Sequence, residues 1–118
     1  MAKILTEEQK KYQKIERGKE YRSIKASLLD QLERAGNNTE FYINLVGDYM
    51  DMYVTKELLN EDVRERGVRV YYDNGGGQRG YKKNESIDQA LKVNAQMLKL
   101  LTELDITPSM EGGEEYEL

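Results

Sequence analysis

The stretch from Thr39 to Arg66 constrains the fold of this chain most strongly, because it contains no proline and only one glycine, Gly47. It is expected to form a single helix that opens at Thr39 and ends at Gly67. A helix of about 27 residues is roughly 40 Å long, which is more than a compact subunit of this size buries comfortably. Its apolar face is also broad, so the helix is expected to contact more than one neighbour. The residues of this face include Tyr42, Leu45, Val46, Tyr49, Met52, Tyr53 and Leu59, with Ile43, Met50, Val54 and Leu58 beside them.

Two shorter helices are expected before this long one. Thr6 and Gln9 have the spacing of a capping box, and they predict a helix that runs to about Arg17, where Gly18 interrupts it. A second helix is predicted over residues 21–34, with an apolar stripe formed by Ile24, Leu28, Leu29 and Leu32. Residues 35–38, Ala-Gly-Asn-Asn, are suited to closing that helix.

A β-hairpin is expected directly after Gly67. Residues 68–72 are mostly β-branched or aromatic, residues 73–77 read Asp-Asn-Gly-Gly-Gly and favour a turn, and residues 78–82 supply the return strand. A two-stranded ribbon is marginally stable by itself. The hairpin is therefore expected to lean on the helices or on another subunit.

The last helix is expected to be capped by Asn84 or Ser86, and its apolar residues alternate at spacings of three and four. They are Ile87, Ala90, Met97, Leu101 and Leu104, with Leu91 and Leu98 beside them. Asn94 falls at an otherwise apolar position, where it either fixes the register between paired helices or lies at the solvent edge. The predicted fold is thus mainly α, with two long helices joined by a β-hairpin and preceded by N-terminal helices.

The composition excludes most catalytic chemistry. The chain has no cysteine and no histidine, which removes thiol chemistry, disulfides and the commonest metal ligands. The glycines at 75–77 are followed by a basic strand instead of a helix, so they are interpreted as a turn and not as a phosphate-binding loop. The carboxylate pairs Glu61 with Asp62 and Asp48 with Asp51 lie on a helix rich in basic residues and are interpreted as solvated or ion-paired surface. No catalytic residue, metal or cofactor is expected.

The tyrosines are the remaining candidates for stacking on bases. Tyr42, Tyr49 and Tyr53 share the helical spacing of the predicted core, so packing explains them better. Four others stay open as candidates, at positions 12, 21, 71 and 81.

Apolar material is scarce in this chain. Hydrophobic residues make up 38% of it, charged residues 34%, and the mean hydropathy is -0.83, so a wide core within one subunit is hard to build. Helices that share their faces with other copies are the expected solution. There is no apolar signal core near the N-terminus and no run of membrane-spanning length, so a cytoplasmic protein is expected.

The net charge of -4 is unevenly distributed along the chain. Residues 1–29 contain eight basic and four acidic residues, whereas the remainder contains ten basic and eighteen acidic residues. This polarity suits a protein whose N-terminal region meets a polyanion, although a merely solvated helix accounts for the charges equally well. The basic residues able to contact phosphates are Lys10, Lys11, Lys14, Arg17, Lys19, Arg22 and Lys25.

The order of elements from Tyr21 to Ser109 resembles that of phage terminase small subunits, most specifically from Gly67 onward. Proteins of this type look like a helix, a long helix, a glycine-rich ribbon and a final helix that ends in a Leu-Gly-Leu-Thr-Pro-like phrase. Here the phrase is Leu-Asp-Ile-Thr-Pro at residues 104–108, and the Asn-Pro often seen before the final helix is Asn-Glu at residues 84–85. The basic residue common shortly after the proline is absent at Met110.

The resemblance implies a component of the genome-packaging motor that is not an enzyme. Such proteins form homo-oligomeric rings, bind the packaging site of the double-stranded phage DNA, and bring it to the large terminase subunit, whose ATPase and nuclease they regulate. Residues 1–36 would then face DNA, residues 37–108 would assemble the ring, and residues 109–118 would form an acidic disordered tail that engages the large subunit or only solubilises the protein.

Carried onto single residues, the resemblance gives two sets of candidates. Arg79, Lys82 and Lys83 form a second DNA contact, beside the N-terminal one, on a ribbon that bridges or braces neighbours. The oligomerisation set is Tyr42, Leu45, Val46, Tyr49, Tyr53, Ile87, Leu91, Met97, Leu98, Leu101 and Leu104. The alternative is an oligomeric helical protein–protein or regulatory module that does not bind DNA.

Overall fold

The computed structural model describes residues 4–106 and confirms the mainly helical fold with one hairpin. In chain order, the elements are α1 (Glu7–Glu16), α2 (Lys19–Arg34), α3 (Glu40–Arg66), β1 (Arg69–Asp73), β2 (Arg79–Lys83) and α4 (Ser86–Glu103). The predicted acidic tail and the Thr107-Pro108 phrase lie outside the described residues.

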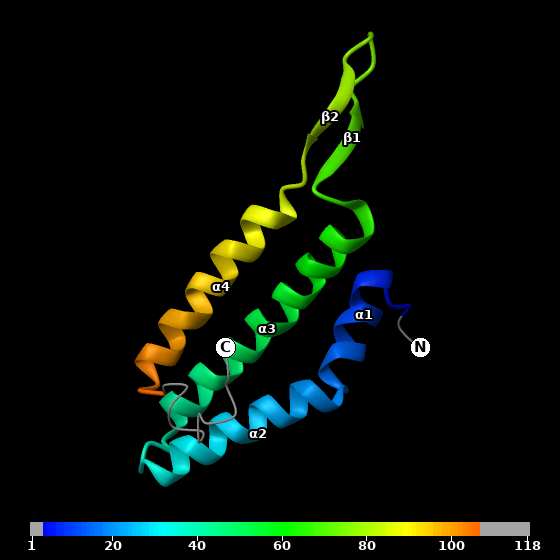
Figure 1. The fold of residues 1–118 in the computed structure, drawn as a ribbon. Coiled ribbons are helices and arrows are strands. Elements are labelled where there is room, and N and C mark those ends of the chain that lie inside the picture. The colour runs from blue at the N-terminus through cyan, green and yellow to red at the C-terminus, as the bar shows by residue number, and fades with distance from the viewer. Residues whose placement is uncertain (1–3, 107–118) are drawn as a thin grey trace, which may run out of the picture.

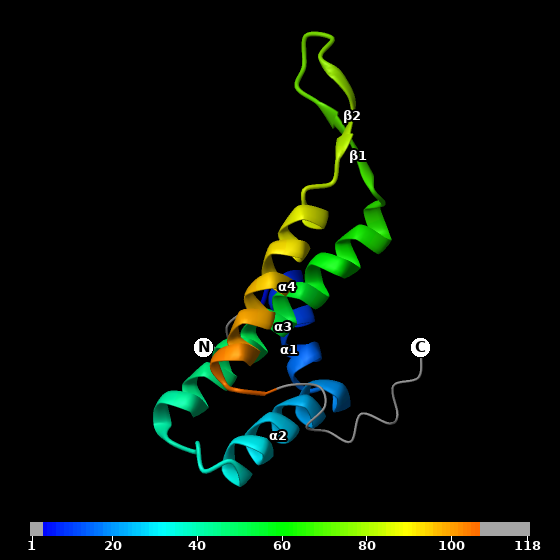
Figure 2. The same cartoon turned by 60° about the vertical axis from the view of Figure 1, so that its left-hand side comes forward.

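Helix α3 is the centre of the subunit, because α1, α2 and α4 all pack on it. Helix α4 returns antiparallel beside α3, and α1 lies along the other side of α3 (Figure 1). Helix α2 crosses the end of α3 that is remote from the hairpin (Figures 1 and 2). The radius of gyration is 18.3 Å, well above the roughly 13.5 Å of a compact chain of this length. The predicted difficulty of building one compact subunit around a long helix is therefore visible in its extended shape.

The local sequence signals account for the N-terminal helix boundaries. Thr6 and Gln9 form the predicted capping box, with the Gln9 N–H donating to the Thr6 hydroxyl at 3.1 Å. Gly18 separates α1 from α2. Gly36 adopts a φ of 77° after α2, and the N–H of Asn37 donates to the carbonyl of Leu32 at 2.8 Å, which is the long-range hydrogen bond of a Schellman motif.

The core lies where α2, α3 and α4 meet, near the end of the subunit remote from the hairpin. It contains Leu28 and Leu32 of α2, Val46, Met50, Tyr53 and Val54 of α3, and Met97, Leu104 and Ile106 from α4 and the residues after it. Tyr12, Ile15 and Tyr21 from the N-terminal helices pack against its edge. Residues 4–106 include no helix with the length and apolar character needed to cross a membrane.

The two strands are antiparallel and begin one residue later than predicted. Tyr71 pairs with Tyr81, and Arg69 pairs with Lys83. Gly67 and Val68 form the connection from α3, and the N–H of Asn84 donates to the Val68 carbonyl at 2.7 Å just below the ladder. Gly75, Gly76 and Gly77 all have positive φ, so the glycine run makes the predicted turn.

Both ends of α4 explain the short phrases on which the family resemblance rests. The Asn84 side chain accepts from the N–H of Ser86 at 2.9 Å and caps the helix, and Glu85 follows with a φ of -63°, a value that proline also adopts. At the other end, Asp105 has a φ of 57°, and the N–H of Ile106 donates to the Leu101 carbonyl at 3.0 Å. Asp105 thus occupies the left-handed position that glycine fills in the family phrase.

Replacing Asp105 with glycine is expected to stabilise the fold. The left-handed conformation costs an L-residue about 1 kcal/mol, and a carboxylate also meets the negative end of the α4 dipole. Asp105→Gly should raise the free energy of unfolding by about 1 kcal/mol in a urea titration. Asp105→Ala is the matched control, since it also removes the carboxylate but keeps the left-handed strain, and it should be less stable than Asp105→Gly. Equal stability of the two variants would contradict this explanation.

Candidate functional site

The predicted oligomerisation residues divide into two groups in the structure. Val46, Tyr53, Met97 and Leu104 are buried inside the subunit, where its own helices cover them. Leu91 and Leu98 are 65% and 57% exposed. The other residues of the set are partly buried: Tyr42, Leu45, Tyr49, Ile87 and Leu101.

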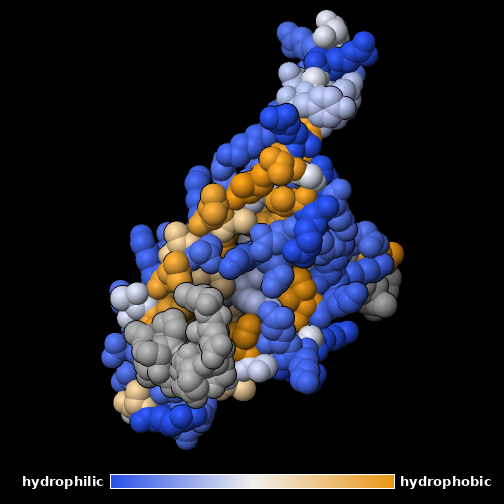
Figure 3. Space-filling model, viewed as in Figure 1, coloured by the Kyte–Doolittle hydropathy of each residue, from blue (hydrophilic) through white to orange (hydrophobic). Residues whose placement is uncertain are grey.

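The outward face of α4 is an apolar surface available for packing with another helix. Ile87, Leu91, Leu98 and Leu101 lie on it, and together with Asn94 they follow spacings of four, three, four and three. A hydrophobic band runs along α4 (Figure 3). Asn94 accepts a hydrogen bond at 2.8 Å from the Lys56 ammonium of α3, so this polar residue ties α4 to α3 at the edge of the band. Such a face can pack against a helix of another subunit.

The N-terminal basic residues lie on α1 and α2 and are mostly exposed. Lys11 instead faces α3, where its ammonium lies 3.2 Å from Glu61 and 4.0 Å from Glu65. The hydrogen bond and the charge of Glu61 raise the pKa of Lys11. Lys10 pairs with Glu7 at 3.5 Å. Within residues 4–106 no ion pair engages the remaining ones, which are exposed: Lys14, Arg17, Lys19, Arg22 and Lys25.

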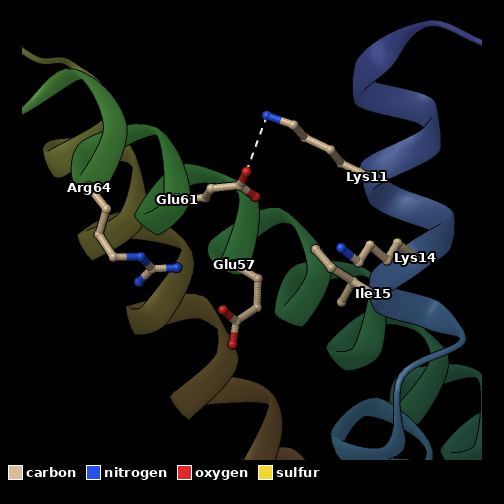
Figure 4. Close-up of a pocket in the computed structure, with 6 residues that line it drawn as sticks. All are labelled: Lys11, Lys14, Ile15, Glu57, Glu61 and Arg64. Carbon is tan, nitrogen blue, oxygen red and sulfur yellow. Dashed lines mark ion pairs between the residues drawn. The ribbon is translucent and has the colours of Figure 1, made fainter.

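A groove between α1 and α3 carries mixed charge. Lys11 and Lys14 line it from α1, and Glu57, Glu61 and Arg64 line it from α3 (Figure 4). The acidic side chains of α3 therefore stand close to two of the seven predicted phosphate contacts. They reduce the positive potential on this side of α1, whereas Arg17, Lys19, Arg22 and Lys25 lie at the other end of α1 and on α2.

Tyrosine hydroxyls join the N-terminal helices to α3. Tyr12 donates to Asp51 at 3.1 Å, and Tyr53 donates to Glu20 at 2.7 Å. Burial and the Asp51 hydrogen bond raise the pKa of Tyr12 to about 12. The ring centroids of Tyr21 and Tyr53 also lie 6.1 Å apart. Tyr12 and Tyr21 are therefore packing residues, and of the four open tyrosines only Tyr71 and Tyr81 stay exposed.

The hairpin is joined to the helices by a polar cluster around Asn84, which is completely buried. The Asn84 amide donates to the carbonyl of Gly67 at 3.0 Å and to Asp62 at 3.2 Å. Its oxygen accepts from the Ser86 N–H and, at 3.3 Å, from the Arg66 guanidinium. One side chain thus connects the end of α3, the chain entering β1, the end of β2 and the start of α4. The sequence indicated Asn84 only as a helix cap.

Asp62 completes this cluster from the side of α3. It accepts from Nε and Nη2 of Arg66 at 2.6 and 2.7 Å and from the Ser86 hydroxyl at 2.8 Å. The Arg66 hydrogen bonds, followed by the one from Ser86, hold the pKa of Asp62 well below its ordinary value. The predictions for Glu61 and Asp62 are confirmed, since both carboxylates are ion-paired.

The second predicted DNA contact, formed by Arg79, Lys82 and Lys83, lies on the ribbon. Side chains alternate between the two faces of a strand, so these three residues do not share one face. Arg79 and Lys83 lie on one face of β2, and Lys82 lies on the other. Lys83 forms an ion pair at 2.8 Å with Asp88 of α4. Arg69, which the sequence pattern did not indicate as a DNA contact, is paired with Lys83 across the ladder and shares its face.

Within residues 4–106, no three acidic side chains are grouped so that they could hold a metal ion. The arrangement can instead support two kinds of contact. One is apolar packing along α4, and the other is charge attraction along the exposed basic residues of α1, α2 and the ribbon.

Comparison with protein families gives one finding. A family model described as "Phage terminase, small subunit" matches residues 21–114, which is well over half of the chain. Comparisons with curated proteins and with solved structures gave no match.

Removing the Asp62 carboxylate is expected to change how stability depends on pH. The folded pKa of Asp62 is depressed below its ordinary value of 3.8, so its contribution is present above about pH 4 and is lost as the pH falls further. Asp62→Asn should lower the free energy of unfolding by about 2 kcal/mol at pH 7, because a charged acceptor is lost. Urea titrations at pH 7, 5 and 3 should show this deficit shrinking at pH 3.

The matched control is Asp48→Asn, which removes an exposed carboxylate from the same helix. Its stability difference from the wild type should stay small at all three pH values. A deficit for Asp62→Asn that is the same at pH 7 and pH 3 would show that the carboxylate charge is not what stabilises the junction.

Proposed function

Because the chain belongs to the family of phage terminase small subunits, which implies a role in phage DNA packaging, we propose that it is the DNA-binding adaptor of a packaging motor. In this proposal the protein forms a homo-oligomeric ring, binds the packaging site of double-stranded phage DNA in the infected bacterial cytoplasm, and recruits and regulates the large terminase subunit. It has no catalytic role of its own.

The exposed apolar face of α4 is the single observation that supports the proposed assembly into a ring. A chain with little apolar material exposes Leu91 and Leu98 by more than half on one helix face. Large apolar side chains exposed together mark a surface that packs against another molecule. We assign residues 37–108 to assembly, with the α4 face packing against the helices of the next copy.

The exposed cations of α1 and α2 support the DNA part. A duplex attracts such residues through its phosphates without regard to sequence. Each subunit supplies only a few of them, but several copies around a ring add their contacts to one duplex, so the total attraction grows steeply with copy number. We assign residues 1–36 to DNA contact, with Arg17, Lys19, Arg22 and Lys25 ahead of Lys11, which is engaged by Glu61.

The oligomeric module without DNA binding is the alternative function. The same apolar face of α4 supports it equally, and it differs from the leading proposal in one measurable property. It predicts assembly with no affinity for duplex DNA even at low salt.

Charging the α4 face is expected to break the assembly. Leu91→Asp and Leu98→Asp place a carboxylate at the centre of the proposed contact, where burying an unpaired charge is strongly unfavourable. Native mass spectrometry should show an oligomer for the wild type and mainly monomer for each variant, with circular dichroism unchanged. Ile4→Asp, at another exposed apolar residue, should keep the oligomer. A monomeric wild type at micromolar concentration would refute the ring.

Neutralising the N-terminal cations is expected to weaken DNA binding in a salt-dependent way. The variant carrying Arg17→Ala, Lys19→Ala, Arg22→Ala and Lys25→Ala loses up to four phosphate contacts per subunit. Its affinity for duplex DNA should fall at least tenfold at low salt, and the slope of log K against log salt should become shallower. Fluorescence anisotropy over a salt series measures both. Unchanged binding would move the DNA site elsewhere on the protein.

The control is a variant with Lys92→Ala and Lys99→Ala, two cations of α4 that lie outside both predicted DNA contacts. It tests whether the loss follows the position of the charges or only their number. An equal loss of affinity per charge removed in both variants would argue against a defined N-terminal site.

A further inference from the structure

The ribbon is an arm that stands clear of the rest of the subunit. Its two strands pair with each other, and the hairpin projects beyond the ends of α3 and α4 in both views (Figures 1 and 2). The polar cluster around Asn84 holds it at its base. Lys83 at the end of β2 also pairs with Asp88 of α4, so the subunit's own helices hold the arm at its base, and the rest of the hairpin extends away from them.

The ribbon is also a positively charged segment of the described chain, second to residues 10–25, which hold seven basic and two acidic residues. Residues 68–83 contain four basic residues and one acidic residue, whereas residues 4–36 contain eight basic and six acidic ones. The ribbon therefore has a positive excess of three charges, larger than the excess of two over all of residues 4–36. Because the whole chain carries a net charge of -4, this arm is a local exception.

One face of the arm combines these charges with two tyrosines. The antiparallel register places three cross-strand pairs on this face: Arg69 with Lys83, Tyr71 with Tyr81, and Asp73 with Arg79. Tyr71 and Tyr81 are 55% and 72% exposed, and their rings pack edge to face with the ring centroids 5.7 Å apart. We call these six residues the tyrosine face.

The opposite face of the arm is built differently. It carries Val70, Tyr72 and Lys82, and Tyr72 lies across Gly80, where an added Cβ would stand 3.5 Å from the tyrosine hydroxyl. Tyr72 thus covers the glycine of the partner strand and serves the ribbon itself. The two faces separate the tyrosines into one that stabilises the arm and two that are left for a partner.

We propose that the tyrosine face enters the major groove of duplex DNA. The inference deepens the proposed function, on which it rests, by assigning a groove contact to the ribbon beside the phosphate contacts of α1 and α2. The major groove of B-DNA admits a two-stranded β-ribbon. Arg69 and Arg79 supply the cations for phosphates or guanine edges, ahead of Lys83, which is engaged by Asp88. The tyrosines supply rings and hydroxyl groups for base edges.

Charge favours DNA over a second copy of the chain as the partner of this face. Four of its six residues are charged, whereas the buried centre of a protein interface is depleted of charged residues. The uncharged pair consists of tyrosines, whose hydroxyls can still hydrogen-bond in a wet groove. The turn beyond this face consists largely of three glycines, and no atom lies within 4 Å of a Cβ added to any of them. The tip of the arm is therefore narrow enough to enter a groove ahead of the tyrosine face.

Two matched substitutions on β2 test the inference. Arg79→Ala and Lys82→Ala each remove one positive charge from the same exposed strand, but from opposite faces. Affinity for duplex DNA is measured by fluorescence anisotropy over a salt series, and assembly by native mass spectrometry. We expect Arg79→Ala to weaken binding about tenfold and Lys82→Ala to weaken it less than threefold, at unchanged oligomer mass. Equal losses would overturn the groove contact, because they would reflect charge alone.

Photocrosslinking gives an independent readout. Duplex DNA carrying 5-bromodeoxyuridine is irradiated with the wild-type protein, and the attached peptides are mapped by mass spectrometry. Crosslinks to Tyr71 or Tyr81 would support the inference. Crosslinks confined to α1 and α2 would overturn it and leave the proposed function standing.

Two further outcomes separate the failures. A changed oligomer mass for Arg79→Ala with intact DNA affinity would show that the arm braces a neighbouring subunit, which overturns the groove contact. A wild-type protein that assembles but binds no duplex at low salt would remove the proposed DNA role together with this inference.

Discussion

The hydrogen bonds of Asn84 hold together the part of the fold that gives this subunit its shape. Four chain segments meet at one buried amide: the end of α3, the entry to β1, the exit from β2 and the start of α4. Asp62 and Arg66 supply the charges that surround it. This cluster and the ion pair of Lys83 with Asp88 connect the ribbon to the helices at its base. The antiparallel course of α3 and α4 begins from the same point.

Local sequence signals predicted most of the elements, because capping residues and glycines mark many of the helix ends. The Thr6 capping box, Gly18, Gly36 and Gly67 mark boundaries at which backbone hydrogen bonds are completed within a few residues. The phrases of the family resemblance turned out to be the two ends of α4. These signals depend on neighbours in sequence, so they can be read without knowing the fold.

Contacts between distant segments could not be predicted in the same way. The apolar pattern of α4 is broad enough to fit two orientations, and only packing on α3 buries Met97 and Leu104 while leaving Leu91 and Leu98 outside. Likewise, the positive charge of Lys11 is evident from the sequence, but its pairing with Glu61 requires α1 to lie along α3. The ribbon site predicted from the sequence lacked Arg69 for a related reason. Only the register of the strands shows that Arg69 and the two candidate tyrosines share a face with Arg79 and Lys83.

The attachment of the ribbon has a mechanical consequence. Strands of five residues make a lever about 17 Å long, and a sideways load on the glycine tip becomes a torque at its base. There the load meets directional hydrogen bonds at Asn84 and Asp62 rather than a glycine hinge alone. Because these hydrogen bonds join residues of α3 and α4, a load on the tip would act on both helices that carry the proposed assembly faces.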